Sequence, residues 1–190
     1  MARKFLRFMV SQRGIEVNPD KIWAIMEMAL PRNTKEVKCL NGKVVVLNRF
    51  VSRVTNKCLP FFRTLKKSFE WTAECQQAFD DLKAYLSSPP LLSPSQPGEY
   101  LFLYLVVSLA AVSEALVKEE DRVQKPMYCT SRALRGAEER SLPMEKLAFT
   151  LVTATRKLKP YFYAHIVVVL IDKPLQQAMS NPEAARQMAQ

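Results

Sequence analysis

The chain has 190 residues, of which 48% are hydrophobic, and it carries a formal net charge of +10 at pH 7. This composition supports one large or two small globular domains and excludes a low-complexity chain. The cysteines, Cys39, Cys58, Cys75 and Cys129, form no C-x-x-C pair, and His165 is the only histidine. This pattern disfavours a zinc site and predicts reduced thiols in an intracellular protein.

The positive charge is concentrated in the first part of the chain. The first 70 residues contain 15 Lys and Arg against 5 Asp and Glu, whereas residues 71–190 contain 13 of each. The first segment is therefore the candidate surface for a polyanion, and a basic solvated face is the alternative. The longest uncharged apolar stretch, 100–113, is too short to span a bilayer comfortably, so we expect no membrane segment.

The beginning of the sequence predicts a hairpin followed by helices. Residues 4–10 and 15–17 flank the tetrapeptide SQRG, which is typical of a β-hairpin. Asn18 is suited to cap a helix that runs to about residue 28, with Pro19 at its first position. A second helix is predicted over residues 34–54, before a loop around proline 60.

The predicted helix over residues 34–54 separates a basic stripe from an apolar one. At about 100° per residue, the apolar side chains project opposite the basic ones. Gly42 falls within the basic stripe, where a missing Cβ would let a sugar-phosphate backbone approach. The candidate nucleic-acid contacts are Lys35, Lys38, Gly42, Arg49 and Arg53. A solvated lysine-rich face with a helix break at Gly42 is the alternative.

A third helix and a proline-rich joint follow in the block FEWTAECQQAFDDLKAYLSSPPLLSP, residues 69–94. Apolar side chains recur there at helical spacing, and Thr72 is suited to cap the helix start. Pro89 and Pro90 then prevent the helix from continuing.

Beyond the joint, the sequence predicts three meandering strands, a helix, a strand and a further helix. The continuous apolar run YLFLYLVV is typical of a central strand. The predicted strands cover residues 100–107, 111–118, 126–130 and 166–171, and the helices run over 141–158 and from Pro174 onward.

These segments resemble Gypsy-type LTR retrotransposon Pol polyproteins, at the junction of reverse transcriptase and ribonuclease H. The joint resembles the pattern F-x-W-x-x-x-C-x-x-A-F-x-x-L-K-x-x-L-x-x-P-P-x-L. NPDKIWAI and KEVKCLNGKVVVLNRFVS resemble the thumb, and KFLRFMVSQRGIEV resembles the preceding hairpin, with Arg7 in place of its usual glycine. The resemblance implies an α+β fold. Residues 1–88 would form a hairpin plus helical thumb and connection, 89–98 a joint, and 99–190 a C-terminally truncated ribonuclease H-like α/β domain.

The resemblance also implies where a catalytic site would lie. Ribonuclease H uses two metal ions, Mg²⁺ in the parent family, held by clustered carboxylates. Glu145 in MEKLAF and Asp172 after VVVLI match two of these carboxylates. Val106 stands where the first aspartate would be, Glu114 is offset from that position, and the fourth carboxylate would follow Gln190. The alternatives are that Glu145 complements a helix dipole and that Asp172 favours a helix start.

We therefore expect a fragment of a reverse transcriptase/ribonuclease H polyprotein that has neither activity and needs no cofactor. Its expected partners are RNA–DNA or DNA duplexes, bound without sequence specificity. Two alternatives stay open: a structural remnant without a ligand, and a metal-dependent nuclease that uses Glu145 and Asp172. We also expect a cytoplasmic or nuclear location, and self-association through an exposed edge of the strand 166–171.

Overall fold

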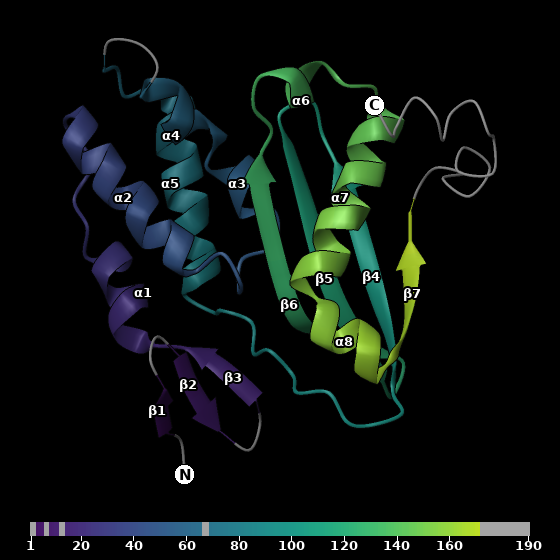
Figure 1. Ribbon diagram of the computed structural model, residues 1–190. Coiled ribbons are helices and arrows are strands. Elements are labelled where there is room, and N and C mark those ends of the chain that lie inside the picture. The colour runs from purple at the N-terminus through teal and green to yellow at the C-terminus, as the bar shows by residue number, and fades with distance from the viewer. Residues whose placement is uncertain (1–2, 6–7, 12–13, 66–68, 172–190) are drawn as a thin grey trace.

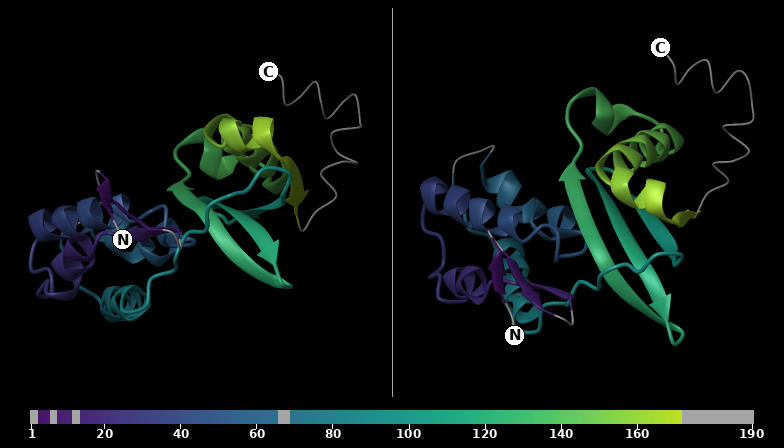
Figure 2. Two further views of the ribbon diagram at one scale, coloured as in Figure 1. Left: turned by 90° about the horizontal axis from the view of Figure 1, so that it is seen from below. Right: turned by 60° about the horizontal axis from the view of Figure 1, so that its bottom comes forward.

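Figure 1 shows the computed structural model of the chain, which describes residues 3–5, 8–11, 14–65 and 69–171. A small sheet and helices from the first part of the chain lie beside a larger sheet that helices cover on one face (Figures 1 and 2). The α+β class expected from the sequence is confirmed.

The small antiparallel sheet has the order β1-β2-β3, with β1 at Arg3–Phe5, β2 at Phe8–Ser11 and β3 at Gly14–Val17. Strands β2 and β3 form the expected hairpin, but the single strand expected over residues 4–10 is wrong, because β1 and β2 pair with each other with Phe5 opposite Phe8. Gly14 has φ of 139°, and a Cβ there would collide with the carbonyl oxygen of Leu92. Leu92 exchanges two backbone hydrogen bonds with Ile15, of 2.8 and 3.0 Å. The proline-rich joint is thus attached to β3.

The helices of the first part are α1 (Pro19–Met26), α2 (Thr34–Val46), α3 (Val54–Lys57), α4 (Leu59–Thr64) and α5 (Ala73–Leu86). The expected caps are present: the Asn18 side chain accepts from the Asp20 N–H at 3.0 Å, and Thr72 accepts from the Cys75 N–H at 3.3 Å. The buried faces of these helices share one apolar core, which includes Leu40, Phe61, Phe79 and Leu82.

The single helix predicted over residues 34–54 is wrong, because α2 ends at Val46. The loop expected around Pro60 is also wrong, because Pro60 lies in the first turn of α4. Beyond Val46 the backbone bonds to a distant strand instead of continuing a helix. The Cys129 N–H donates to the Arg49 carbonyl at 3.1 Å, and the Asn48 amide exchanges hydrogen bonds of 3.3 and 3.2 Å with the Ser131 backbone. Arg53 then adopts a left-handed conformation with φ of 52°, which starts the short helix α3.

The larger sheet has the order β6-β5-β4-β7, in which β7 is parallel to β4 and the other pairs are antiparallel. Its strands are β4 (Tyr100–Val107), β5 (Ala111–Glu120), β6 (Val123–Ala133) and β7 (Ile166–Leu170). Asp121 and Arg122, with φ of 54° and 61°, make the tight turn between β5 and β6. Positive φ at both central residues is typical of a type I′ hairpin turn.

Helices α6 (Ala137–Arg140), α7 (Pro143–Lys157) and α8 (Lys159–Ala164) connect β6 to β7. The apolar side of α7 covers the sheet, and Leu147 and Ala154 join Leu103 and Leu116 in a second core. The helix predicted from Pro174 lies outside the described residues. Among the described helices, none combines the length and the apolar character that a membrane crossing requires.

Candidate functional site

The exposed face of α2 carries three of the predicted nucleic-acid contacts. Lys35, Lys38 and Gly42 are exposed, whereas Leu40 and Val44 of the same helix are buried in the core. Asn33 and Glu36 fix the start of the helix: the Glu36 N–H donates to Asn33 Oδ1 at 3.0 Å, and the Glu36 carboxylate accepts the Arg32 N–H at 2.7 Å. This cap is typical of a rigid helix start, so the two lysines lie on a well-defined face.

Gly42 lies in the middle of this exposed face. A Cβ added there would meet no atom within 4 Å, so internal packing does not require a glycine at this position. Glycine in a helix interior costs about 1 kcal/mol relative to alanine. What the glycine does provide is an open path to the backbone of α2.

The other two predicted contacts do not extend this face. Arg49 turns inward, and its guanidinium carbon lies 4.9 Å from the ring centroid of Tyr128 and 5.8 Å from that of Phe8. Arg53 is exposed, but it precedes α3 and does not belong to α2. The structure therefore groups Lys35, Lys38 and Gly42 on one helix face and separates them from Arg49 and Arg53.

The candidate carboxylate site lies at the end of the larger sheet where β4 and β7 finish. These two strands run parallel, so their carboxyl ends lie at the same end of the sheet. The start of α7 is there too, because Lys146 Nζ donates to the Leu109 carbonyl, just after β4, at 3.4 Å. Val106 is near the carboxyl end of β4, and Glu145 is in the first turn of α7. Both residues thus lie at this end of the sheet.

The Glu145 carboxylate is engaged by its own helix. Its Oε2 atom accepts the Leu142 N–H at 2.8 Å, as a glutamate at this position of a capping box does. Asp172 lies outside the described residues. Within the part of the chain that is described, no three His, Cys, Asp or Glu side chains gather as a metal would require. Of the residues that the sequence matches to metal ligands, the described part of the chain contains Glu145 alone, and one carboxylate does not hold two metal ions.

A buried carboxylate at Glu114 was not predicted as such from the sequence. Its side chain lies under α7 and is only 4% exposed, with Oε1 at 3.5 Å from Lys157 Nζ. Among the described residues, its Oε2 has no hydrogen-bond partner. Burial raises the pKa of this carboxyl, and the positive charge of Lys157 opposes the rise. Glu114 is paired with Leu105 across the sheet, whereas Val106 is paired with Ser113, so Glu114 is offset from the position of Val106.

The strand order and the crossover through α7 are those of a ribonuclease H-like protein. The family model described as the RNase H-like domain found in reverse transcriptase matches residues 71–169, and the chain belongs to this family. The expected resemblance to retrotransposon Pol polyproteins is likewise confirmed.

Among curated proteins, the chain is similar to retrovirus-related Pol polyproteins of Drosophila melanogaster. It is 26% identical to that of transposon opus over 193 residues, which covers 94% of this chain and 19% of that protein. It is also 26% identical to that of transposon 412 over 185 residues, covering 95% and 15%. The Tf2-3 polyprotein of Schizosaccharomyces pombe is 28% identical over 120 residues, covering 62% and 9%. The chain spans less than a fifth of the length of these relatives.

Among solved structures, the chain is similar to the foamy viral protease-reverse transcriptase. The complex of that protein with dsDNA has a TM-score of 0.73 at 21% identity, covering 95% of this chain and 39% of that one. Its complex with RNA/DNA hybrid also has a TM-score of 0.73, at 18% identity, covering 98% and 27%. At these identities the similarity shows a shared fold.

Proposed function

We propose that this chain is a duplex-binding segment of the reverse transcriptase/ribonuclease H type that has no catalytic activity of its own. The observation that carries the proposal is the exposed basic face of α2, where Lys35 and Lys38 lie on the same side of the helix as Gly42. Lysines placed in this way neutralise phosphates and position a duplex without reading its sequence. The free cysteines agree with a site of action inside the cell, in the cytoplasm or nucleus.

Two further observations support this proposal. The foamy viral structures with the same fold hold dsDNA and RNA/DNA hybrid, so the fold is compatible with duplex binding. Conversely, Val106 cannot ligate a metal ion, and the Glu145 carboxylate already accepts a backbone N–H. Mg²⁺ is the metal of the parent family, and we propose that this chain does not use it. A structural segment that binds nothing is the alternative.

The proposal is tested by fluorescence anisotropy with a labelled RNA–DNA hybrid of about 20 base pairs. We expect binding that weakens about tenfold or more between about 50 and 200 mM salt, because phosphate neutralisation releases counterions. Lys35→Glu/Lys38→Glu should weaken binding at low salt by about tenfold or more, because it places two negative charges beside the phosphates.

The matched control is Arg140→Glu/Arg156→Glu, which makes the same charge change at exposed positions of α6 and α7. We expect this control to bind within about threefold of the unmodified chain. Equal weakening by both double variants would reduce the effect to net charge and reject a specific role for α2. Binding that is absent, or indifferent to salt, would favour the structural alternative.

A further inference from the structure

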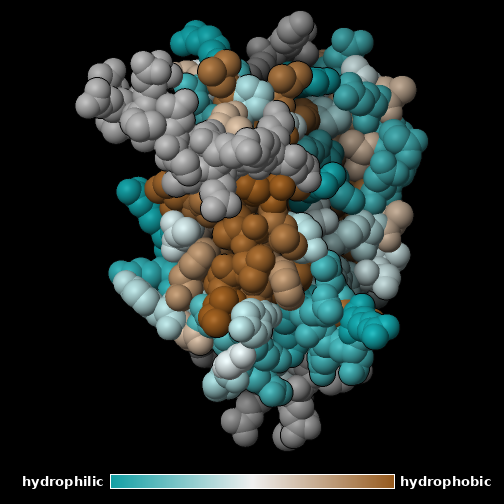
Figure 3. Space-filling model, turned by 90° about the vertical axis from the view of Figure 1, so that its right-hand side faces the viewer, coloured by the Kyte–Doolittle hydropathy of each residue, from teal (hydrophilic) through white to brown (hydrophobic). Residues whose placement is uncertain are grey.

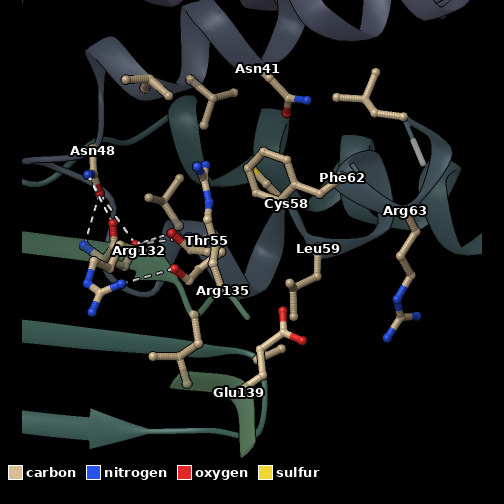
Figure 4. Close-up of a pocket in the computed structure, with 18 of the residues that line it drawn as sticks. Asn41, Asn48, Thr55, Cys58, Leu59, Phe62, Arg63, Arg132, Arg135 and Glu139 are labelled. Atoms are coloured by element: carbon tan, nitrogen blue, oxygen red, sulfur yellow. Dashed lines mark hydrogen bonds between the residues drawn. The ribbon is translucent and has the colours of Figure 1, made fainter. Parts of the chain in front are cut away.

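A cavity of about 860 Å³ lies between the helices of the first part and the end of the larger sheet. Helices α2, α3 and α4 form one wall, and the end of β6 with the segment leading into α6 forms the other (Figure 4). Its volume falls within the range of roughly 300 to 1,000 Å³ that small-molecule sites occupy. It is separate from the exposed lysines of α2, which are absent from its lining.

The Asn41 side chain is the most informative group in this cavity. It is only 8% exposed, and within the described part of the chain neither its amide nitrogen nor its amide oxygen has a hydrogen-bond partner. Buried polar side chains are almost always paired, so an amide that is unpaired on both atoms indicates a missing partner. The partner must offer an acceptor and a donor side by side, because Asn presents one of each.

The rest of the lining favours a flat ligand with an anionic group. Phe62, partly exposed, extends toward Asn41 in Figure 4 and offers an aromatic face. Arg135 reaches into the same space, and its guanidinium makes no hydrogen bond or ion pair with the described residues. Arg132, by contrast, is neutralised by Glu138 through bonds of 2.7 and 2.9 Å, and its hydrogen bond lowers the pKa of that carboxyl.

The cavity contains no activated nucleophile among its described residues. Burial raises the pKa of the Cys58 thiol to about 12, so this group stays protonated and unreactive at neutral pH. Glu139, at the exposed end of the cavity, has a carboxylate suited to accept hydrogen bonds from hydroxyl groups. The chemistry of the lining therefore points to binding and not to reaction.

We propose that this cavity binds an adenine nucleotide. The Asn41 amide would pair with the N6 and N7 edge of adenine, which is the base edge that asparagine recognises with two hydrogen bonds. The Phe62 ring would stack on the base, Arg135 would bind the phosphate and Glu139 a sugar hydroxyl. The ligand is either a free nucleotide or an unpaired adenylate of a strand. This site reads a base, which the proposed duplex contacts on α2 do not.

The test is isothermal titration of the full chain with AMP, and with purine riboside 5′-monophosphate for comparison. We expect saturable AMP binding, and binding of the comparison nucleotide weaker by about tenfold, because its base lacks the N6 amino group that would donate to the amide oxygen. Asn41→Leu should weaken AMP binding by about tenfold or more. No saturable AMP binding, or equal affinity in Asn41→Leu, would overturn the proposal.

Additional variants keep the test decisive. Asn41→Leu removes an unpaired buried amide, so thermal melting should show a fold at least as stable as that of the unmodified chain. Arg135→Gln should also weaken AMP binding, whereas Arg140→Gln, an exposed neighbour outside the cavity, should not. Loss of AMP binding in Arg140→Gln equal to that in Arg135→Gln would reject the assigned phosphate contact.

Competition with a single strand identifies whether the ligand is a free nucleotide or part of a strand. The lysine variant of α2 separates the adenine site from the proposed duplex binding. A short oligo(dA) strand that displaces AMP assigns the site to an unpaired adenylate, and failure to displace assigns it to a free nucleotide. The Lys35→Glu/Lys38→Glu variant should bind AMP normally even if it loses duplex binding. AMP binding lost in this variant would contradict a separate cavity site.

Discussion

At the scale of single residues, side chains with the same formal charge have different roles in this chain. Lys35 and Lys38 project from the exposed face of α2, whereas Arg49 lies between the rings of Phe8 and Tyr128. Reversing the charge of Arg49 would disrupt that packing, so a loss of binding there would not identify a phosphate contact. The variant expected to lose duplex binding therefore changes Lys35 and Lys38 and leaves Arg49 in place.

Glu114 provides a prediction about stability. Because burial raises its pKa, the folded chain holds this proton more tightly than the unfolded chain, and stability falls as pH rises from the ordinary value of 4.5 toward the folded pKa. Glu114→Gln should therefore raise the Tm at neutral pH by roughly 2–4 °C, or about 1 kcal/mol. The gain should shrink as the pH is lowered toward 4.5, the lower end of this window.

The measurement is a thermal melt across this pH range, with Glu119→Gln as the control. Glu119 lies on the same strand but is exposed, so its replacement should change little. A Glu114→Gln variant that is less stable at neutral pH would show that the ion pair with Lys157 outweighs the cost of burying the carboxylate.

At the scale of elements, the hairpin, the caps of α1 and α5, and all four strands of the larger sheet were predictable, because local patterns specify them. The helix over 34–54 was not. Leu47 and Val51 are buried, as the helical periodicity predicted, but their backbone is not helical. Periodicity reports which side chains face a core. It does not reveal that the Arg49 carbonyl bonds to Cys129, eighty residues away in sequence.

The candidate sites, like the secondary structure, were predictable where they depend on local sequence and not where they depend on the tertiary fold. The exposed lysines and the valine at position 106 follow from residue identity and local pattern. The sequence leaves two interpretations of Glu145 open, a metal ligand and a charge that complements the helix dipole. The bond of its carboxylate to the Leu142 N–H at the start of α7 is consistent with the second. The cavity at Asn41 has no local signature, because its two walls come from distant segments that only the tertiary fold brings together.

Ser131 is one of the residues that join β6 to the segment after α2, which leads to a prediction for these elements. It is buried, and its hydroxyl accepts the Thr55 N–H at 2.9 Å while also bonding the Thr55 hydroxyl at 2.9 Å. Ser131→Ala leaves both Thr55 groups without this partner, so we expect a loss of about 1–3 kcal/mol in the free energy of unfolding. Chemical denaturation measures this loss.

Ser87→Ala is the matched control, because the Ser87 hydroxyl makes an exposed bond to the Ala84 carbonyl. We expect that control to lose less than about 0.5 kcal/mol. If Ser131→Ala loses no more than Ser87→Ala, the junction between β6 and the helical part does not depend on this serine.

At the scale of the whole molecule, the two parts of the chain meet along β6 and the proline-rich joint. Ser93 donates to the Pro126 carbonyl at 2.8 Å, and Asn48 and Thr55 bond to Ser131. The division into segments 1–88, 89–98 and 99–190 stays a prediction. These contacts lead us to expect that the two larger segments unfold together.

The outer side of β7 bears on self-association. Ile166 is 62% exposed and Val168 37%, and Figure 3 shows an apolar patch on the side of the molecule that carries this strand. Apolar, β-branched strands exposed in this way are prone to pair with other chains. Self-association through this strand stays a prediction, since residues 172–190 are outside the described part of the chain.

The proposal of duplex binding without catalysis is tested most directly by incubating the chain with labelled RNA–DNA hybrid in Mg²⁺ or Mn²⁺, and measuring binding and cleavage in the same sample. Because Val106 cannot bind a metal ion, we expect the hybrid to be bound and its RNA strand to remain intact. Cleavage that disappears in Glu145→Gln would contradict the proposal and show that the chain completes a catalytic site.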